Sequence, residues 1–289
     1  MNIIRMTGGL GNQMFQYALY LKYRSIGIEA KFDDWTEYEE RDNARPISLG
    51  VFDINYPRAT KTEYNEYTDS YMNLGARIRR KLSGRKSREY LEKPYSFDEE
   101  VLKLDNAYVS GYFQSEKYFA DIREEVLSSF VFNENTKDVA KRIFGDIPDE
   151  NTVSIHIRRG DYLAAQDIYG NICTEKYYDK CVRYILEKKP DVKFLVFSND
   201  SEWTQMWKQK YISEGVNIKS VQGTTEDTGY VDMYLMSNCA HHIIANSSFS
   251  WWGSYLSTGK YKDGIILAPS KWNNVAEQTD IYTDRMIIV

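Results

Sequence analysis

The alternation of apolar and polar positions divides the chain into an irregular first half and a regular second half. From residue 152 onward, short apolar runs typical of buried strands alternate with longer segments whose apolar residues recur at helical spacing. This alternation predicts a parallel sheet with helices on both faces. The predicted strands are Val153–Ile157, Phe194–Phe197, Ile218–Val221, His242–Ala245 and Ile265–Leu267. The predicted helices are Thr174–Lys188, Ser201–Lys210, Tyr230–Asn238 and Ser247–Ser257.

The first half begins with a strand, a glycine turn and a helix. Asn2–Met6 is a short apolar run, and Met14, Ala18 and Leu21 recur at helical spacing after the glycines. Residues 36–100 are polar and rich in tyrosine, and their pattern predicts no definite structure. Further expected elements are strands at Ile28–Phe32 and Ala107–Phe113, and a helix capped by Ser115 with Phe119, Ile122, Val126 and Phe130 on one face.

A polar stretch separates the two halves. Residues 133–151 contain Gly145 and Pro148 and few apolar positions, which is typical of a domain boundary. We therefore expect two α/β domains, residues 1–150 and residues 151–289.

Composition narrows the class of protein. The 289 residues are 42 % apolar and carry a net charge of −5, which excludes a chain built to coat nucleic acid. Three cysteines without a CxxC pair argue against a zinc site or a disulfide framework. Because the start resembles no signal peptide and no apolar run reaches ~18 residues, we expect a cytoplasmic protein with at most peripheral contact to the inner membrane.

Polar and glycine-rich groups follow four of the predicted strands. In parallel sheets, ligands bind beyond the carboxyl ends of the strands. Glycines allow close approach of the backbone, arginine can grip a phosphate, and hydroxyls at a helix start can hold an anion. The four groups are Gly8–Gln13, Arg158–Asp161, Phe197–Asp200 and Asn246–Ser250.

Each group also has a purely structural interpretation. The glycines fit a tight turn, Arg158 with Asp161 fits a surface ion pair, and Phe197–Asp200 fits a turn with a helix cap. Capping needs one hydroxyl rather than three, which favours a ligand at the fourth group. Trp251 and Trp252 fit the core better than a sugar platform.

The basic run Arg77–Arg88 fits a solvated helix face. A minority interpretation is contact with an anionic, lipid-diphosphate-linked acceptor at a membrane surface.

Several known chemistries lack their residues. There is no Asp-x-Asp, GxSxG, Walker A or HExxH pattern, and the adjacent His241 and His242 suit no single metal ion. The remaining groups predict a metal-free phosphate site between the two α/β halves. Such a site suggests a nucleotide-linked donor.

Five motifs together resemble the bacterial α-1,2-fucosyltransferases, which are relatives of the blood-group H enzymes and, more distantly, of the α-1,6- and protein O-fucosyltransferases. In order they are GGLGNQMFQYA, GYFQSEKYF, HIRRGDY, FSND and DMYLMSNCAHHIIANSSFSWWG, and they extend from residue 7 to residue 253. The resemblance implies a GT-B-type fold with two Rossmann-like domains facing each other across a cleft. It also implies a GDP-L-fucose donor, an inverting reaction and no metal or other cofactor.

The resemblance also assigns roles by position. Arg158 would hold the β-phosphate, His156 would lie beside the nucleotide, and Asp232 would read the guanine. The block Asn246, Ser247, Ser248 and Phe249 would contact the donor, with the two serines on the diphosphate. Gly9, Gly11 and Asn12 would form the loop over the fucose and phosphate.

The implied reaction is direct displacement of GDP by O2 of a terminal β-galactoside, in an oligosaccharide or a lipid-linked glycan. Asp161 is the candidate base, although it could instead orient Arg158, and the family pattern does not transfer at this position. Two alternatives stay open: a transferase that uses another GDP-sugar, and a non-catalytic glycan-binding protein.

Overall fold

The chain forms two compact units, Met1–Ser129 (unit 1) and Phe130–Val289 (unit 2). In this computed structural model, the described residues are 1–289 without 43, 94–95, 161, 163, 226 and 277–278. The boundary between the two units therefore lies before helix α6 (Glu134–Phe144). The polar stretch had suggested a boundary after this segment, at residue 150. Asn133 caps α6, and Ala140 on its buried face packs with Leu195 and Phe197 of unit 2. This apolar contact assigns the helix to unit 2.

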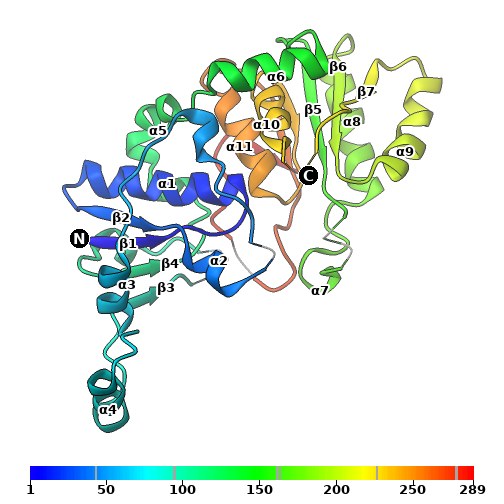
Figure 1. Ribbon diagram of the computed structural model, residues 1–289. Helices are drawn as coiled ribbons and strands as arrows, with labels where there is room; N and C mark the ends of the chain where they lie inside the picture. The colour runs from blue at the N-terminus through cyan, green and yellow to red at the C-terminus, as the bar shows by residue number, and fades with distance from the viewer. Residues whose placement is uncertain (43, 94–95, 161, 163, 226, 277–278) are drawn as a thin grey trace. The chain divides into compact units, whose positions relative to one another are not determined.

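Unit 1 is a parallel sheet with short helices and turns (Figure 1). Its strand order is β2-β1-β4-β3, and every pairing is parallel. The strands are β1 (Asn2–Arg5), β2 (Ala30–Asp33), β3 (Glu89–Leu91) and β4 (Tyr108–Ser110). The α-helices are α1 (Leu10–Ser25), α2 (Thr36–Glu40), α3 (Lys61–Thr68), α4 (Leu74–Ser83) and α5 (Arg123–Ser129). The 3-10 helices are η1 (Leu49–Phe52), η2 (Glu99–Lys103), η3 (Glu116–Tyr118) and η4 (Ala120–Ile122).

Helix α1 is the core of unit 1. Met14, Phe15, Ala18 and Leu19 are fully buried, and the hydroxyl of Tyr23 donates to the carbonyl of Val101 over 2.8 Å. The predicted strand–turn–helix start is therefore confirmed.

Two predictions for unit 1 were wrong in detail. The helix expected after Ser115 is broken into η3, η4 and α5, because Phe119 has φ −143° and ends the first turn. The strand expected over 107–113 is limited to β4, since Phe113 takes a left-handed φ of 52°. Residues 36–100, for which the sequence predicted nothing definite, contain α2 to α4, β3 and two 3-10 helices.

Unit 2 is a six-stranded parallel sheet in the order β10-β9-β8-β5-β6-β7. The strands are β5 (Thr152–Ile157), β6 (Lys193–Ser198), β7 (Ile218–Ser220), β8 (His241–Ile243), β9 (Ile266–Ala268) and β10 (Met286–Ile288). The helices after α6 are α7 (Gln166–Tyr169), α8 (Glu175–Lys188), α9 (Ser201–Ser213), α10 (Gly229–Ser237) and α11 (Ser248–Ser257). The expected strands and helices are confirmed within a few residues, and α6, α7 and β10 were missed.

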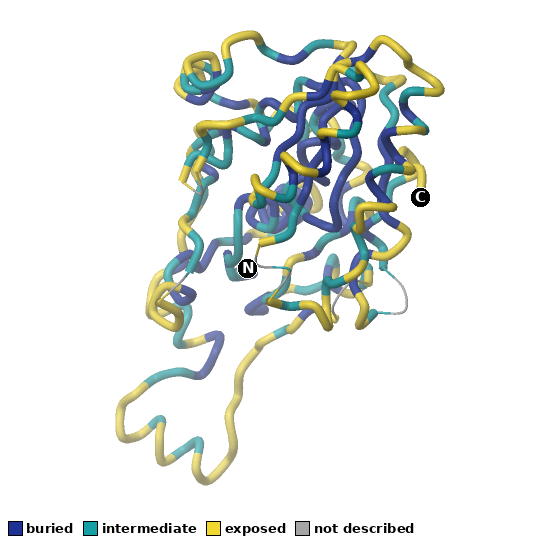
Figure 2. The backbone as a smooth tube through the Cα atoms, turned by 90° about the vertical axis from the view of Figure 1, so that its right-hand side faces the viewer, coloured by how far each residue is buried: buried dark blue, intermediate teal, exposed yellow. Residues whose placement is uncertain are grey.

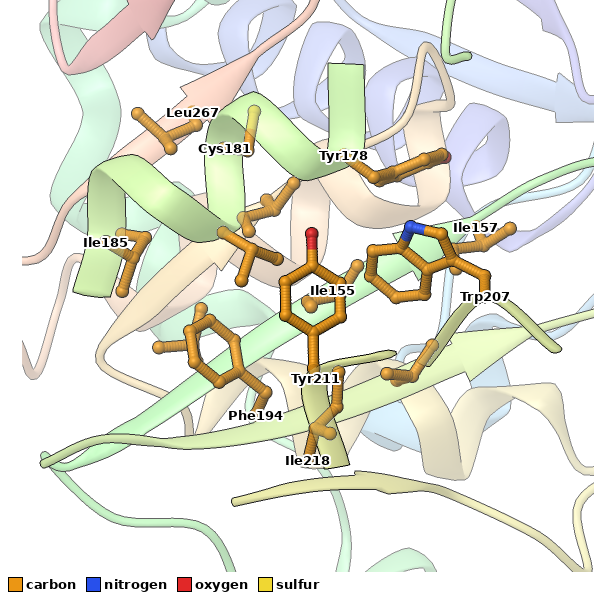
Figure 3. Close-up of a cluster of buried hydrophobic side chains, with 14 of the residues drawn as sticks. Ile155, Ile157, Tyr178, Cys181, Ile185, Phe194, Trp207, Tyr211, Ile218 and Leu267 are labelled. Carbon is orange, nitrogen blue, oxygen red and sulfur yellow. The ribbon is translucent and has the colours of Figure 1, made fainter. Parts of the chain in front are cut away.

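Helices cover both faces of this sheet, as the alternating pattern predicted. On one face, Ile155 and Ile157 of β5 pack with residues of α8 and α9, including Tyr178, Trp207 and Tyr211 (Figure 3). On the other face, β6 packs against residues of α6, α10 and α11. The carboxyl ends of the central strands are thereby held at one edge of a rigid sheet.

Candidate functional site

Two arginines follow strand β5, and their side chains have different partners. Val153, Ile155 and Ile157 belong to the core under α8 and α9, so His156 and then Arg158 belong to the alternate face. The Arg158 guanidinium lies 5.7 Å from the centre of the Tyr162 ring. The Arg159 side chain instead donates to Asp200 over 3.0 Å. The expected divergence of the two arginines is confirmed.

The turn after β5 is held by a residue of the next strand end. Asn199 Oδ1 accepts from the backbone N–H of Arg159 at 2.9 Å and of Gly160 at 3.3 Å. A Cβ on Gly160 would lie 2.5 Å from Asn199 Nδ2, so only glycine fits without displacement. Asp200 caps α9 by accepting from the N–H of Trp203. The cap was predicted from sequence, whereas the positioning role of Asn199 was not.

Tyr162 links the β5 exit to the β8 exit. Its hydroxyl donates to the carbonyl of Asn246 at 2.9 Å, and its ring stacks on Tyr169 with centres 4.5 Å apart. Asn246 is buried and donates from Nδ2 to the carbonyl of Trp272 at 3.0 Å. Tyr162 therefore contacts Arg158 through its ring and Asn246 through its hydroxyl. Sequence reasoning missed this link.

The hydroxyls at the start of α11 have different roles. Ser247 is the N-cap and accepts from the N–H of Phe249 at 3.4 Å. The Ser250 hydroxyl donates back to the carbonyl of Ala245. Ser248 is half-buried at the first position of the helix. Ser247 and Ser250 therefore have local structural roles, and Ser248 lies between them at the start of the helix. Trp251 and Trp252 are fully buried, as predicted.

His156 is a buried imidazole with an unfilled polar position. Its ring centre lies 5.7 Å from that of Phe249, and its Nδ1 has no hydrogen-bond partner among the described residues. Burial, with the nearby Arg158 charge, lowers its pKa to about 3. His156 is therefore neutral at physiological pH, and it can accept or donate one hydrogen bond to a ligand.

Asp232 on α10 also has a buried polar atom that is not satisfied. Its Oδ2 accepts from the Thr224 hydroxyl at 3.2 Å, and its Oδ1 is buried without a partner among the described residues. Burial raises its pKa to about 7. A buried acceptor of this kind is costly unless a donor reaches it, so Asp232 is poised to receive N–H groups of a ligand.

The predicted residues of unit 1 lie where β1 leads into α1: Gly9 is in the turn, and Gly11 and Asn12 are in the first turn of the helix. Gly8 has φ +78°, and a Cβ there would lie 2.6 Å from Asn12 Nδ2, which explains the glycine. Gly9 is the N-cap of α1, and nothing lies within 4 Å of where its Cβ would be. Asn12 Oδ1 accepts from Gln114 Nε2 at 2.8 Å.

Buried side chains fix this glycine turn. Gln13 donates from Nε2 to the carbonyl of Gly8 at 2.8 Å, and Gln16 Oε1 accepts from the N–H of Thr7 at 3.1 Å. Glu37 Oε2 accepts from the N–H of Gly8 at 3.0 Å. The motif GGLGNQMFQ contained both glutamines, but only the fold shows that they hold the turn.

Glu92 is a buried carboxylate that the sequence did not reveal. It follows β3, and its Oε2 accepts from the N–H of Tyr112 at 2.7 Å. A Cβ on Gly111 would lie 2.3 Å from the Cβ of Glu92, so glycine permits this packing. Burial raises the pKa of Glu92 to about 7.

Two predictions for the site remain open. Asp161, the candidate base, lies outside the described residues. The described residues contain no group of three His, Cys, Asp or Glu side chains arranged to hold a metal ion. Metal independence stays a prediction for experiment.

Comparison with known proteins agrees with this geometry. The family model described as "Glycosyl transferase family 11" matches residues 85–286. The chain is 34 % identical over 278 residues to an alpha-1,2-colitosyltransferase of Escherichia coli, covering 93 % of this chain and 91 % of that protein. It is 32 % identical over 303 residues to the O-antigen biosynthesis glycosyltransferase WbnK of Escherichia coli, covering 95 % of this chain and 96 % of that protein.

A more distant relative and a solved structure extend the comparison. The galactoside alpha-(1,2)-fucosyltransferase 1 of Oryctolagus cuniculus is 25 % identical over 181 residues, covering 59 % of this chain and 47 % of that protein. The crystal structure of POFUT1 in complex with GDP has a TM-score of 0.53 at 11 % identity, covering 92 % of this chain and 97 % of that one. This likeness confirms the expected α/β, GT-B-type fold. The family model covers most of the chain and the relatives match nearly its whole length, and the chain belongs to glycosyl transferase family 11.

Proposed function

We propose that this glycosyltransferase transfers L-fucose from GDP-L-fucose to O2 of a terminal β-galactoside, with inversion and without a metal. The observation that carries the proposal is a pair of unsatisfied groups in unit 2, His156 and Asp232. His156 and Asp232 each keep a buried polar atom without a partner among the described residues, and Arg158 follows just beyond β5, where its charge helps to lower the pKa of His156. A guanine base supplies N–H donors for a carboxylate, and a diphosphate supplies anionic oxygens for a guanidinium.

The charge that develops on departure of GDP is the main catalytic demand. In the proposed reaction, the acceptor oxygen forms a bond to the anomeric carbon while the bond to the β-phosphate oxygen breaks. Arg158 and Ser248 stabilise the negative charge on the leaving phosphate, and one preorganised donor is typically worth about 3 kcal/mol. Asn246 and Ser247 support this donor side through the backbone, and Phe249 packs beside His156.

His156 acts as a neutral hydrogen-bond partner of the nucleotide, because its pKa of about 3 keeps it uncharged. For Gly9, Gly11 and Asn12 of unit 1, contact with the donor stays a prediction from the family resemblance. Asp161 remains the candidate base for the acceptor hydroxyl, and a pH–rate profile of Asp161→Asn tests it. The loss of the acidic limb, where protonation of the base lowers the rate, supports the role, and an unchanged profile refutes it.

The donor is the least constrained part of the proposal. The colitosyltransferase relative makes GDP-colitose a second candidate. Colitose is fucose without the 3-hydroxyl, and a site built to bond a hydroxyl rejects the analogue that lacks it. The glycan-binding alternative is disfavoured, because it gives no reason for the buried unsatisfied groups of unit 2.

A donor panel with product linkage analysis tests the function. GDP-L-fucose, GDP-colitose and GDP-mannose are offered with a β-galactoside acceptor, with and without EDTA. We expect fucose transfer to O2 that survives EDTA. A preference for GDP-colitose would show that colitose, not fucose, is the sugar transferred. Loss of activity in EDTA that Mn²⁺ restores would refute metal independence. Glycan binding without GDP and without turnover would refute the proposed transferase activity.

A further inference from the structure

Helix α4 (Leu74–Ser83) has no buried residue, although it contains three large apolar side chains. The exposed fractions of Leu74, Ile78 and Leu82 are 71 %, 50 % and 79 %. The four most exposed large apolar side chains among the described residues are Leu82, Met72, Leu91 and Leu74. Exposed apolar surface is thus concentrated at this helix and the edge strand β3, and such patches mark interaction sites.

The apolar side chains of α4 form one stripe. Leu74, Ile78 and Leu82 are spaced four residues apart, which places them on one side of the helix. Arg77 and Lys81 are exposed beside this stripe, whereas Arg79 and Arg80 on the opposite side are half-buried. Figures 1 and 2 show α4 at one end of its unit, away from the strands of the sheet and largely exposed.

The half-buried side anchors the helix to the rest of unit 1. Arg79 forms an ion pair with the buried Asp69, and this guanidinium holds the pKa of Asp69 at about 2. Arg80 donates to the carbonyls of Asp69 at 2.9 Å and Tyr71 at 2.8 Å. Arg85, beyond the helix, donates to the carbonyl of Thr68 at 2.8 Å. The apolar stripe is therefore presented outward in a fixed orientation.

Charge identifies the surface that this stripe fits. Residues 70–88 contain seven basic and no acidic residues, while the rest of the chain has 30 basic and 42 acidic residues. The positive charge is therefore local to the exposed apolar helix. An apolar stripe flanked by Lys and Arg is typical of helices that lie in the interface of an anionic bilayer. Nucleic acid would match the charge but would leave the apolar stripe in water.

We propose that α4 attaches the protein to anionic lipid bilayers, with Leu74, Ile78 and Leu82 in the acyl boundary and Arg77 and Lys81 at the headgroups. The attachment is peripheral and reversible, because a single short helix buries little apolar area. Each basic residue near an anionic surface contributes about a fivefold gain in partitioning. This attachment is independent of the donor sugar.

Sedimentation with vesicles tests the proposal on the whole chain. We expect binding to phosphatidylcholine vesicles that contain phosphatidylglycerol, weaker binding at high salt, and little binding to phosphatidylcholine alone. The apolar variant Leu74→Ser/Ile78→Ser/Leu82→Ser should reduce the partition coefficient at least about tenfold. The charge variant Arg77→Gln/Lys81→Gln should reduce it about 25-fold.

Matched controls come from unit 2. Met206 on α9 is 66 % exposed, and Lys260 and Lys262 are exposed. Met206→Ser and Lys260→Gln/Lys262→Gln should bind vesicles like the wild type, and thermal unfolding checks that every variant folds.

Three results would overturn the proposal. Failure of the wild type to bind anionic vesicles would refute attachment outright. Full binding by the apolar variant would show a purely electrostatic surface for polyanions. A dimer in sedimentation velocity that is lost in the apolar variant, without vesicle binding, would assign the stripe to a second copy of the chain.

Discussion

At the carboxyl edge of the unit 1 sheet, buried carboxylates already have donors. Asp33 accepts from the hydroxyl of Tyr108 at 2.6 Å, Glu37 from the N–H of Gly8, and Glu92 from the N–H of Tyr112. At the corresponding edge of unit 2, His156 and Asp232 keep polar atoms without partners among the described residues. The three carboxylates of unit 1 thus hold neighbouring segments in place, whereas His156 and Asp232 can still receive a ligand.

The largest expected effect is at Arg158. Arg158→Ala should reduce kcat for fucose transfer about 100- to 1000-fold, because it removes the donor proposed for the leaving phosphate. Steady-state kinetics measures this effect, with circular dichroism as a check on folding.

Arg159→Ala is the matched control. Arg159 is committed to Asp200 at 3.0 Å and lies 4.6 Å from the centre of the Trp203 ring. Its loss should lower the free energy of unfolding by about 1 kcal/mol and reduce kcat much less. Equal losses in both variants would contradict the division of roles.

The second effect is the pH dependence of stability. Burial raises the pKa of both Asp232 and Glu92 to about 7, whereas unfolded carboxyls titrate near pH ~4. Between these values the folded state binds more protons, so the free energy of unfolding falls as the pH rises through this window. Each carboxyl should account for about 2–4 kcal/mol of this fall in the free energy of unfolding. Asp232→Asn or Glu92→Gln should remove the part that belongs to the substituted residue. Chemical unfolding at about pH 4 and about pH 8, on the two sides of this window, measures the change.

Added GDP distinguishes the two carboxyls. Guanine N–H groups favour the charged form of Asp232, so GDP should bind more tightly as the pH rises toward about 7. It should also cancel the contribution of Asp232 to the pH dependence and leave that of Glu92. A GDP affinity that is constant across this range would refute the assignment of guanine to Asp232.

The third effect compares two adjacent glycines. Gly8→Ala should lower the free energy of unfolding by about 1–3 kcal/mol, because φ is +78° and the new Cβ meets Asn12. Gly9→Ala should change stability little, since nothing lies within 4 Å of its Cβ position. Thermal unfolding measures both variants. A strong loss of transfer in Gly9→Ala at unchanged stability would support its place beside the donor, and full activity would contradict it.

The smallest effect is at Asn199. Asn199→Ala removes the acceptor of two partly exposed N–H groups, at a cost of about 1 kcal/mol. The turn that carries Arg158 should loosen, so KM for the donor should rise less than about tenfold while kcat changes little. A change of kcat alone would contradict a positioning role.

The sequence predicted those parts of the molecule whose signals are local. Val153, Ile155 and Ile157 alternate within one strand, and Ser247 caps the helix that begins at the next residue. These patterns follow from strand and helix periods, so β5, β8 and α11 could be placed with the site residues between them.

Other features depend on contacts between distant segments. Glu92 meets Tyr112, and Asn199 meets Arg159 and Gly160 across two strand ends. Neither partner is marked by spacing in the sequence. Helix α4 was suggested only as a solvated face in the basic run Arg77–Arg88, because it has few tertiary contacts and only a three-residue apolar stripe within a polar region.

The strand order of unit 2 has a consequence for folding. Strand β5 lies between β6 and β8, and the hydroxyl of its Ser154 meets the ring of His242, 88 residues later in the chain. Sheets that close such long loops fold slowly. During synthesis, β5 can pair with β6 early but must wait for β8 with its other edge uncovered. The strand exits that carry Arg158 and Asn246 thus come together only after β8 has been made, and an exposed strand edge in the waiting chain is a site for aggregation or chaperone binding.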